Sequence, residues 1–119
     1  MPTPRVVILD DQPGLADILA LSLRGNGYLA IGFTRPAEAL AALQEADILV
    51  TDYHMPEMTG LEVARRAYAA GWRGSLFIMS GHAAAIREPM DHPLLQFLLH
   101  KPFSTSALIE VLPHPEPIR

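Results

Sequence analysis

The feature that most constrains the fold is a regular alternation of short apolar runs with segments of helical periodicity. Five apolar runs, with no polar residue at every second position, recur at 6–9, 29–33, 48–51, 76–79 and 97–99. Strands of this kind are buried on both faces, as in a parallel sheet. Apolar residues after the first run recur at helical spacing, at Leu15, Ile18, Leu19 and Leu23. The pattern predicts an α/β fold in which helices cover both faces of a doubly wound parallel sheet through right-handed crossovers.

Local signals place the ends of five helix-like segments. Gly25 and Gly27 end the first segment, and Pro36 and Gly60 mark the starts of the second and third. Ser104 is the expected N-cap of the last segment. The fourth segment is the least regular, because Pro89 and Pro93 limit any helix within 83–93 to about two turns. The proline-rich tail, 113–119, is expected to be extended.

Length and composition exclude several classes of protein. The 119 residues are 50% hydrophobic, which predicts one domain over 1–119 with its core in about 5–112. The net charge of −4 and the absence of a basic tract argue against direct nucleic-acid binding. There is no cysteine for a disulfide or thiolate metal site. No apolar run approaches the roughly 20 residues that cross a bilayer. No signal-peptide pattern is present, so we expect a cytoplasmic protein without membrane contact.

Polar and charged residues follow the predicted strands at their carboxyl ends. Asp10 and Asp11 follow the first, Asp52 the third, Ser80 the fourth and Lys101 the fifth. Ligands bind at this edge in open α/β sheets. Two like charges about 4 Å apart repel by around 4 kcal/mol at an effective dielectric near 20, so three acids in one place require a cation. Because oxygen ligands favour Mg²⁺, the acids alone predict a metal-assisted phosphate site.

The chemistry of these residues leaves two roles open for Asp52. It is either a metal ligand alone or also a nucleophile, because a carboxylate can attack phosphorus to form an aspartyl phosphate. Lys101 is the only lysine in the chain, and a compact ammonium suits a point contact with a phosphoryl oxygen. The hydroxyl of Ser80 can donate or accept a hydrogen bond at the same group.

Together and in this order, the motifs resemble the receiver domains of two-component response regulators. The motifs are Asp10-Asp11, Asp52-Tyr53-His54-Met55-Pro56, Gly60, Ser80-Gly81 and Lys101-Pro102-Phe103. The resemblance spans residues 6 to about 112. It implies a flavodoxin-like (βα)₅ fold with strand order 2-1-3-4-5 and a single receiver domain, a phosphoprotein of cytoplasmic signal transduction or a phosphorelay.

The resemblance also implies a role for each residue of the site. Asp52 would accept a phosphoryl group from a histidine kinase or phosphotransfer protein. Mg²⁺ would be held by Asp11 and Asp52 directly, by Asp10 largely through water, and by the backbone carbonyl of His54. Ser80 and Lys101 would contact the phosphoryl group, and the bond before Pro102 would be cis, a form that X-Pro bonds adopt at a cost of only about 0.5–1 kcal/mol. Phosphorylation would switch binding to an effector that the sequence does not identify.

Two features depart from the family pattern. The family commonly has an aromatic residue three positions before the lysine, where this chain has Leu98, with Phe97 one residue earlier. Either a bulge before His100 shifts the register, or the aromatic switch is missing. His54 and His82 lie two residues after Asp52 and Ser80, and we hypothesise that they modulate loss of the phosphoryl group at the pocket mouth. The alternative is that both are ordinary exposed loop histidines.

Two other functions remain open at this stage. Leu98 and the proline-rich fourth segment are compatible with a receiver-like interaction domain that no longer takes phosphate. The acid cluster is also compatible with a Mg²⁺-dependent phosphatase that uses an aspartyl nucleophile. Such enzymes generally need a second acid two residues after the nucleophile, where this chain has His54. We therefore expect a signalling domain and not an enzyme.

Overall fold

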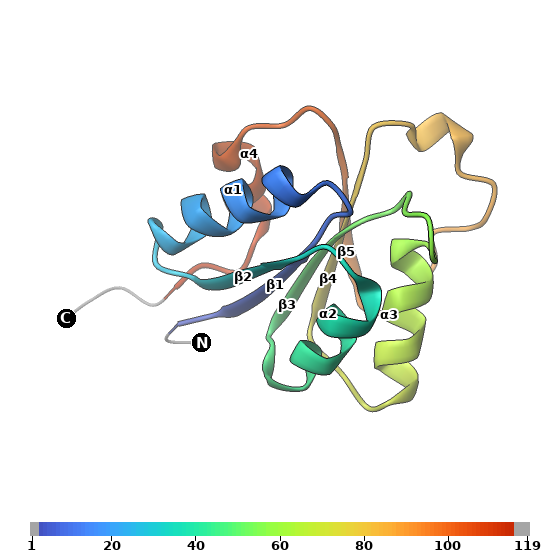
Figure 1. Cartoon of the computed structure of the whole chain (residues 1–119), viewed down its shortest axis with the longest axis horizontal. Helices are drawn as coiled ribbons and strands as arrows, with labels where there is room; N and C mark the ends of the chain where they lie inside the picture. Colours follow the sequence, from blue (N-terminus) through green and yellow to red (C-terminus); the bar gives the residue numbers. More distant parts are fainter. Residues whose placement is uncertain (1–2, 116–119) are drawn as a thin grey trace.

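Five parallel strands form one sheet in the order β2-β1-β3-β4-β5 (Figure 1). The structure is a computed structural model, and it describes residues 3–115. Its elements are β1 (Arg5–Leu9), α1 (Pro13–Arg24), β2 (Leu29–Phe33), α2 (Pro36–Ala42), η1 (Leu43–Glu45), β3 (Ile48–Asp52), α3 (Gly60–Ala69), β4 (Ser75–Ser80), η2 (Ala83–Ala85), β5 (Leu95–His100) and α4 (Thr105–Val111). The predicted fold class and strand order are confirmed.

The two faces of the sheet carry two separate apolar cores. Helices α1 and α4 cover one face, and α2 and α3 cover the other (Figure 1). Because successive side chains of a strand point to opposite faces, Ile8 and Val50 pack beneath α1 and α4, whereas Val7 and Leu49 pack beneath α2 and α3. Central strands buried on both faces explain why the apolar runs lack polar alternation.

Hydroxyl side chains cap the two later helices. The Oγ1 atom of Thr59 accepts a hydrogen bond from the backbone N–H of Glu62 at 3.1 Å and caps α3. The Oγ atom of Ser104 accepts from the N–H of Ala107 at 3.1 Å and caps α4, at the position the sequence predicts. Each bond satisfies one of the N–H groups that a helix start leaves free.

The connection between β4 and β5 differs from the expectation of a fourth helix-like segment. Within residues 3–115 it contains only the single 3₁₀ turn η2, so four α-helices accompany the five strands. Pro89 and Pro93 account for the difference, since each lacks a backbone N–H and disfavours helical geometry in the residue before it. We call residues 81–94 the strap. Its apolar residues Ile86, Met90 and Leu94 pack against the core beneath α2 and α3.

The register of β5 decides between the two explanations for the missing aromatic residue. Leu76 pairs with Leu95 but Phe77 pairs with Phe97, so the chain bulges between these pairs, and from Phe97 to His100 the pairing is regular. The bulge therefore lies before Phe97, and it does not shift Phe97 into the place of Leu98 in the pairing with β4. Leu98 packs against the core beneath α2 and α3, whereas Phe97 is 48% exposed. Of the two explanations, the structure favours the second, in which the aromatic switch is missing.

The C-terminal tail begins against the first helix–strand turn. The Tyr28 hydroxyl donates to the carbonyl of Pro113 at 2.9 Å, and residues 113–115 form no regular element. The rest of the predicted extended tail, 116–119, lies outside the described residues, as do residues 1 and 2. Of the helices in the described part of the chain, none is long and apolar enough to cross a bilayer.

Candidate functional site

The carboxyl ends of β1, β3 and β5 bring three acids and a lysine together. One carboxylate oxygen from each of Asp10, Asp11 and Asp52 lies within 4.8 Å of the others. The Nζ atom of Lys101 lies 2.8 Å from Oδ2 of Asp10 and 3.5 Å from Oδ1 of Asp52. The four residues that the sequence predicts as the centre of the site are therefore neighbours in space.

A glycine at the start of α3 allows the backbone to fold closely behind Asp52. The N–H of Gly60 donates to the carbonyl of Tyr53 at 2.9 Å. A Cβ atom at Gly60 would lie 2.3 Å from the carbonyl oxygen of Asp52 and 2.8 Å from Cγ2 of Thr51. Because these neighbours are backbone and a buried side chain, only glycine fits here. Helix α3 thus packs directly against the strand end that holds Asp52.

The three acids differ in their surroundings. Asp10 is fully buried, and its two oxygens accept hydrogen bonds from the N–H of Gln12 at 3.0 Å and from Lys101 at 2.8 Å. Asp52 is 8% exposed, whereas Asp11 is exposed on the open side of the pocket. Asp11 is thus the carboxylate that solvent reaches most easily, and Asp10, which is bonded to Lys101, lies deepest.

The charges of the site act on one another. Burial raises the pKa of Asp52; Lys101 opposes this, and the charges of Asp10 and Asp11 add to it, so that the pKa lies above its ordinary value. Burial lowers the pKa of Lys101, but its hydrogen bond to Asp10 and the charges of Asp10 and Asp52 outweigh burial and raise that pKa. Burial thus has a larger effect on the pKa of Asp52 than any one neighbouring charge.

The remaining predicted residues line the same edge. Ser80 is buried at the end of β4, and its Oγ accepts from the N–H of His82 at 3.0 Å. The Lys101–Pro102 peptide bond is cis, and the N–H of Lys101 donates to the carbonyl of Ser80 at 2.9 Å. The exposed rings of His54 and His82 lie 6.0 Å apart between centroids.

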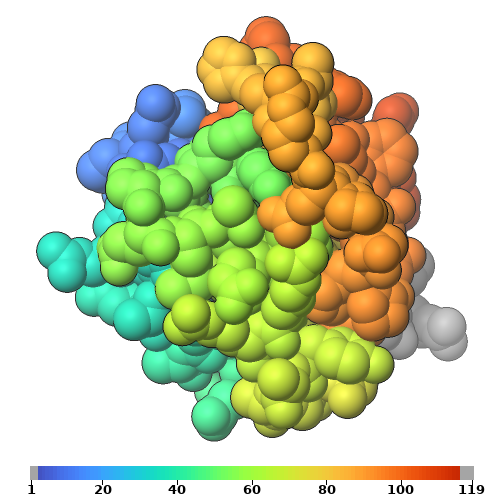
Figure 2. Space-filling model, turned by 90° about the vertical axis from the view of Figure 1, so that its right-hand side faces the viewer, coloured from blue at the N-terminus to red at the C-terminus, as the bar shows by residue number. Residues whose placement is uncertain are grey.

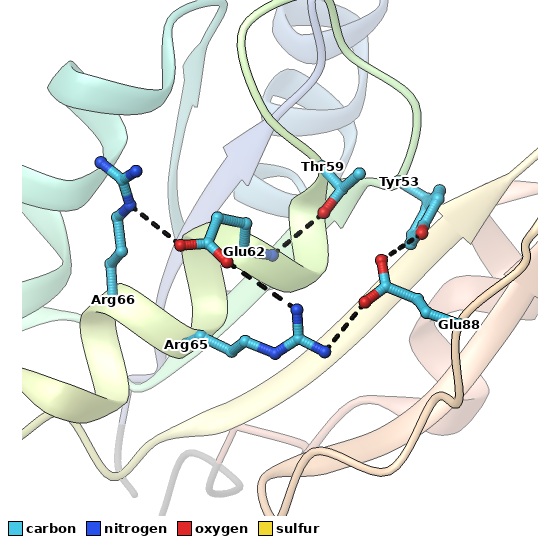
Figure 3. Close-up of polar contacts among 6 residues, drawn as sticks. All are labelled: Tyr53, Thr59, Glu62, Arg65, Arg66 and Glu88. Atoms are coloured by element: carbon cyan, nitrogen blue, oxygen red, sulfur yellow. Dashed lines mark hydrogen bonds and ion pairs between the residues drawn. The ribbon is translucent and has the colours of Figure 1, made fainter.

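The sequence did not predict a polar network that begins at Tyr53, the residue after Asp52 (Figure 3). The hydroxyl of buried Tyr53 donates to one oxygen of Glu88, and Nη2 of Arg65 contacts the other at 2.9 Å. Glu62 pairs with Arg65 at 3.8 Å and with Arg66 at 3.1 Å on the same helix. Burial and Glu88 raise the pKa of Tyr53 to about 12, so this phenol remains a donor. Tyr53 and Glu88 are separated by 35 residues, and no local signal could have paired them.

The donor set of the pocket fits a hard divalent cation. It consists of carboxylate oxygens that are close enough to bind one ion, and oxygen ligands are those that Mg²⁺ prefers. A parallel sheet of order 2-1-3-4-5 with such an acidic pocket and a lysine at its carboxyl edge is the arrangement of the receiver class.

Sequence comparison agrees with this class. The family model for the response regulator receiver domain matches residues 6–113, and the chain therefore belongs to that family. It is 33% identical over 108 residues to the response regulator receiver protein CpdR of Brucella abortus, covering 88% of this chain and 90% of that protein. It is 32% identical over 108 residues to the transcriptional regulatory protein FixJ of Azorhizobium caulinodans, covering 87% of this chain but 51% of that protein.

Solved structures support the same fold. The response regulator TrrA of Thermotoga maritima, in complex with Mg²⁺ and BeF, superposes with a TM-score of 0.77 at 23% identity, over 91% of this chain and 95% of that one. The chain is thus a receiver domain of a two-component system, and the cluster of Asp10, Asp11 and Asp52 matches the phosphorylation site of the family. Receiver domains interact with histidine kinases or phosphotransfer proteins.

Proposed function

We propose that Asp52 accepts a phosphoryl group with the help of Mg²⁺, and that this modification switches the binding of a protein partner. The observation that supports the proposal is the convergence of three carboxylates and one ammonium at the carboxyl edge of the sheet. Phosphoryl transfer needs mainly positioning and compensation of charge, and this arrangement offers both. Residues 1–119 would act as one receiver domain, with the core in about 5–112.

The proposed metal ligands follow from the surroundings of each acid. Asp11 and Asp52 would bind Mg²⁺ directly, and the backbone carbonyl of His54 would be a further ligand. Asp10 would act through water, because its two oxygens already accept from Lys101 and from Gln12. The chemistry that Mg²⁺ supplies when bound is the neutralisation of negative charge on the acids and on the phosphoryl oxygens.

The residues of the chain perform the transfer as follows. A carboxylate oxygen of Asp52 forms a bond to phosphorus while the bond from phosphorus to the donor's imidazole nitrogen breaks, and the bonding electrons stay with that nitrogen. Lys101, already 3.5 Å from Asp52, contacts a phosphoryl oxygen. Ser80 donates its hydroxyl hydrogen to a second oxygen, since its Oγ otherwise only accepts, from His82.

The donor protein is proposed to dock beside the pocket on α1. A groove lined by Leu15, Ile18, Leu19 and Phe103 opens next to Asp10 and Lys101. Ile18 is 62% exposed although it is a large aliphatic residue. An apolar surface that adjoins the reactive carboxylate is suited to a donor that must bring a phosphorylated histidine to Asp52.

The proposal is tested by incubation with acetyl phosphate, with and without Mg²⁺, followed by intact mass measurement. We expect one added phosphoryl group in the wild type with Mg²⁺ and none in Asp52→Asn. Leu98 favours a second candidate function, a receiver-like interaction domain that binds partners without phosphorylation, because the aromatic switch position is aliphatic. An unmodified wild type in the presence of Mg²⁺ would favour that second function.

A further inference from the structure

The middle of the strap, residues 83–91, is joined to the rest of the molecule by one polar side chain. Among the described residues, Glu88 makes the only hydrogen bonds and ion pairs that join 83–91 to elements outside the strap. The two ends of the strap are bonded to β4, through the N–H of His82 to Ser80 and through the carbonyl of Leu94 to the N–H of Leu76. Ile86 and Met90 add apolar contacts with the core beneath α2 and α3. Figure 2 shows the strap, coloured gold to orange, along the green surface that includes α3. A segment with so few attachments opens at low free-energy cost once its main attachment is removed.

Glu88 joins three parts of the fold at one carboxylate. One oxygen accepts from Tyr53, the residue directly after Asp52, and the other pairs with Arg65 on α3 (Figure 3). Because the Tyr53 residue is only 6% exposed, its hydroxyl has little access to water as a replacement acceptor. Loss of Glu88 would therefore free the middle of the strap and leave the hydroxyl of Tyr53 without its acceptor.

The contacts continue from Tyr53 to the mouth of the pocket. The ring of Tyr53 lies 4.8 Å from the ring of His54 in an edge-to-face arrangement, and His54 lies 6.0 Å from His82. His82 belongs to the strap, and its N–H is bonded to Ser80. The strap, Glu88, Tyr53, His54 and His82 thus form a closed ring of contacts, which includes the two residues after Asp52 and the second residue after Ser80.

We propose that Glu88 is a positioning residue for the pocket, which anchors Tyr53 and the strap together and so fixes the separation of His54 and His82 at its mouth. This role rests on the proposed function, because the two histidines then limit the access of water to the phosphoryl group on Asp52. Glu88 does not touch the reacting atoms. Its effect is transmitted through Tyr53 on one side and through the strap on the other.

The test compares Tyr53→Phe, Glu88→Ala and the double variant with the wild type. We expect each single variant to speed amide hydrogen exchange of Ile86 and Leu94 by about tenfold or more, as loss of at least one charge-assisted hydrogen bond allows. The half-life of the phosphorylated protein, after removal of acetyl phosphate, is expected to fall by about threefold or more. Because the Tyr53 hydroxyl reaches the strap through Glu88, which also pairs with Arg65, the double variant should resemble Glu88→Ala and exceed Tyr53→Phe.

Arg66→Gln is the matched control, since it removes an ion pair on α3, between Arg66 and Glu62, that involves neither Glu88 nor Tyr53. It should leave exchange and half-life at wild-type values. Faster strap exchange with an unchanged phosphoryl half-life would overturn the proposal, as would additive effects in the double variant. The imidazole NMR signals of His54 and His82 report on the positions of these two rings, and they can be measured in the unphosphorylated protein. Unchanged signals in both single variants would overturn the role of Glu88, whereas shifted signals in a chain that takes no phosphate would overturn only the function of Asp52.

Discussion

The ionised side chain of Asp52 is expected to lower the stability of the fold that holds it. Its pKa lies above the ordinary 3.8 because of burial and the neighbouring acids, despite Lys101. Between the unfolded and the raised folded value, the native state therefore binds more protons, so stability is greatest below that window and is lost as pH rises through the folded pKa. We expect Asp52→Asn to increase the free energy of unfolding at pH 7. Urea denaturation without Mg²⁺ measures this, and an unchanged or smaller value would contradict it.

Gly60 is the residue whose missing side chain the pocket requires. In Gly60→Ala a methyl group would meet the carbonyl oxygen of Asp52 and the side chain of Thr51. We expect a loss of roughly 1–3 kcal/mol in the free energy of unfolding, together with impaired phosphorylation, because the strand end must shift. Gly14→Ala is the control, since nothing lies within 4 Å of the added Cβ. Equal stability of the two variants would show that the close approach is unimportant.

At this scale, topology decided which residues could be predicted from sequence. Asp10, Asp52 and Lys101 each follow an apolar run, and the carboxyl ends of parallel strands must meet, so their proximity follows from the fold class. The pairing of Tyr53 with Glu88 depends instead on the path of an irregular segment, which no periodicity specifies. The sequence therefore predicted the centre of the site and missed the residues that brace its entrance.

Helix α1 is the element with a large apolar surface beside the pocket. We expect Ile18→Glu to slow phosphoryl transfer from a protein donor about tenfold or more, because a charge in the apolar groove would oppose docking. Transfer from acetyl phosphate, which needs no docking surface, should be unchanged. Leu21→Glu is the matched control, since Leu21 is 66% exposed on the same helix but does not line the groove. Equal slowing in both variants would place the donor elsewhere.

The strap should loosen as pH falls, because its attachment depends on an ionised carboxylate. The hydrogen bonds from Tyr53 and Arg65 hold the pKa of Glu88 below its ordinary 4.5. A lowered folded pKa contributes stability that is present above the unfolded value and is lost as pH falls through the folded value. We expect the protection factor of the Ile86 amide to decline below about pH 4.5 in the wild type. Glu88→Gln should show a lower protection factor without this decline, and an identical pH profile would contradict the assignment.

The β4–β5 connection shows where element prediction reaches its limit. Pro89 and Pro93 predicted a short or irregular segment, but they could not specify that only the turn η2 remains. The position of Leu98 was equally open, because a bulge changes register without changing the apolar pattern. Only the pairing of β5 with β4 shows that the bulge precedes Phe97.

For the whole molecule, the alternation of apolar runs was sufficient to predict the layers. Strands without polar alternation require cover on both faces, and short connections between them require right-handed crossovers. The strand order came from the resemblance to receiver domains, since periodicity alone does not determine which strands are neighbours. In the structure β1 and β3 are neighbours, and the buried acids Asp10 and Asp52 lie together because they stand at the carboxyl ends of these two strands.

Binding of Mg²⁺ should stabilise the whole fold through acids that are expected to destabilise it when no cation is bound. A ligand that binds only the native state raises the free energy of unfolding by about 1.4 kcal/mol at ten times its Kd. We expect this gain in the wild type without any phosphate, and little or none in Asp11→Asn or Asp52→Asn. Asp17→Asn is the control, because Asp17 is exposed on α1 outside the acid cluster. Thermal unfolding with and without Mg²⁺ measures the effect. An equal gain in all four proteins would mean that the cation binds outside the pocket.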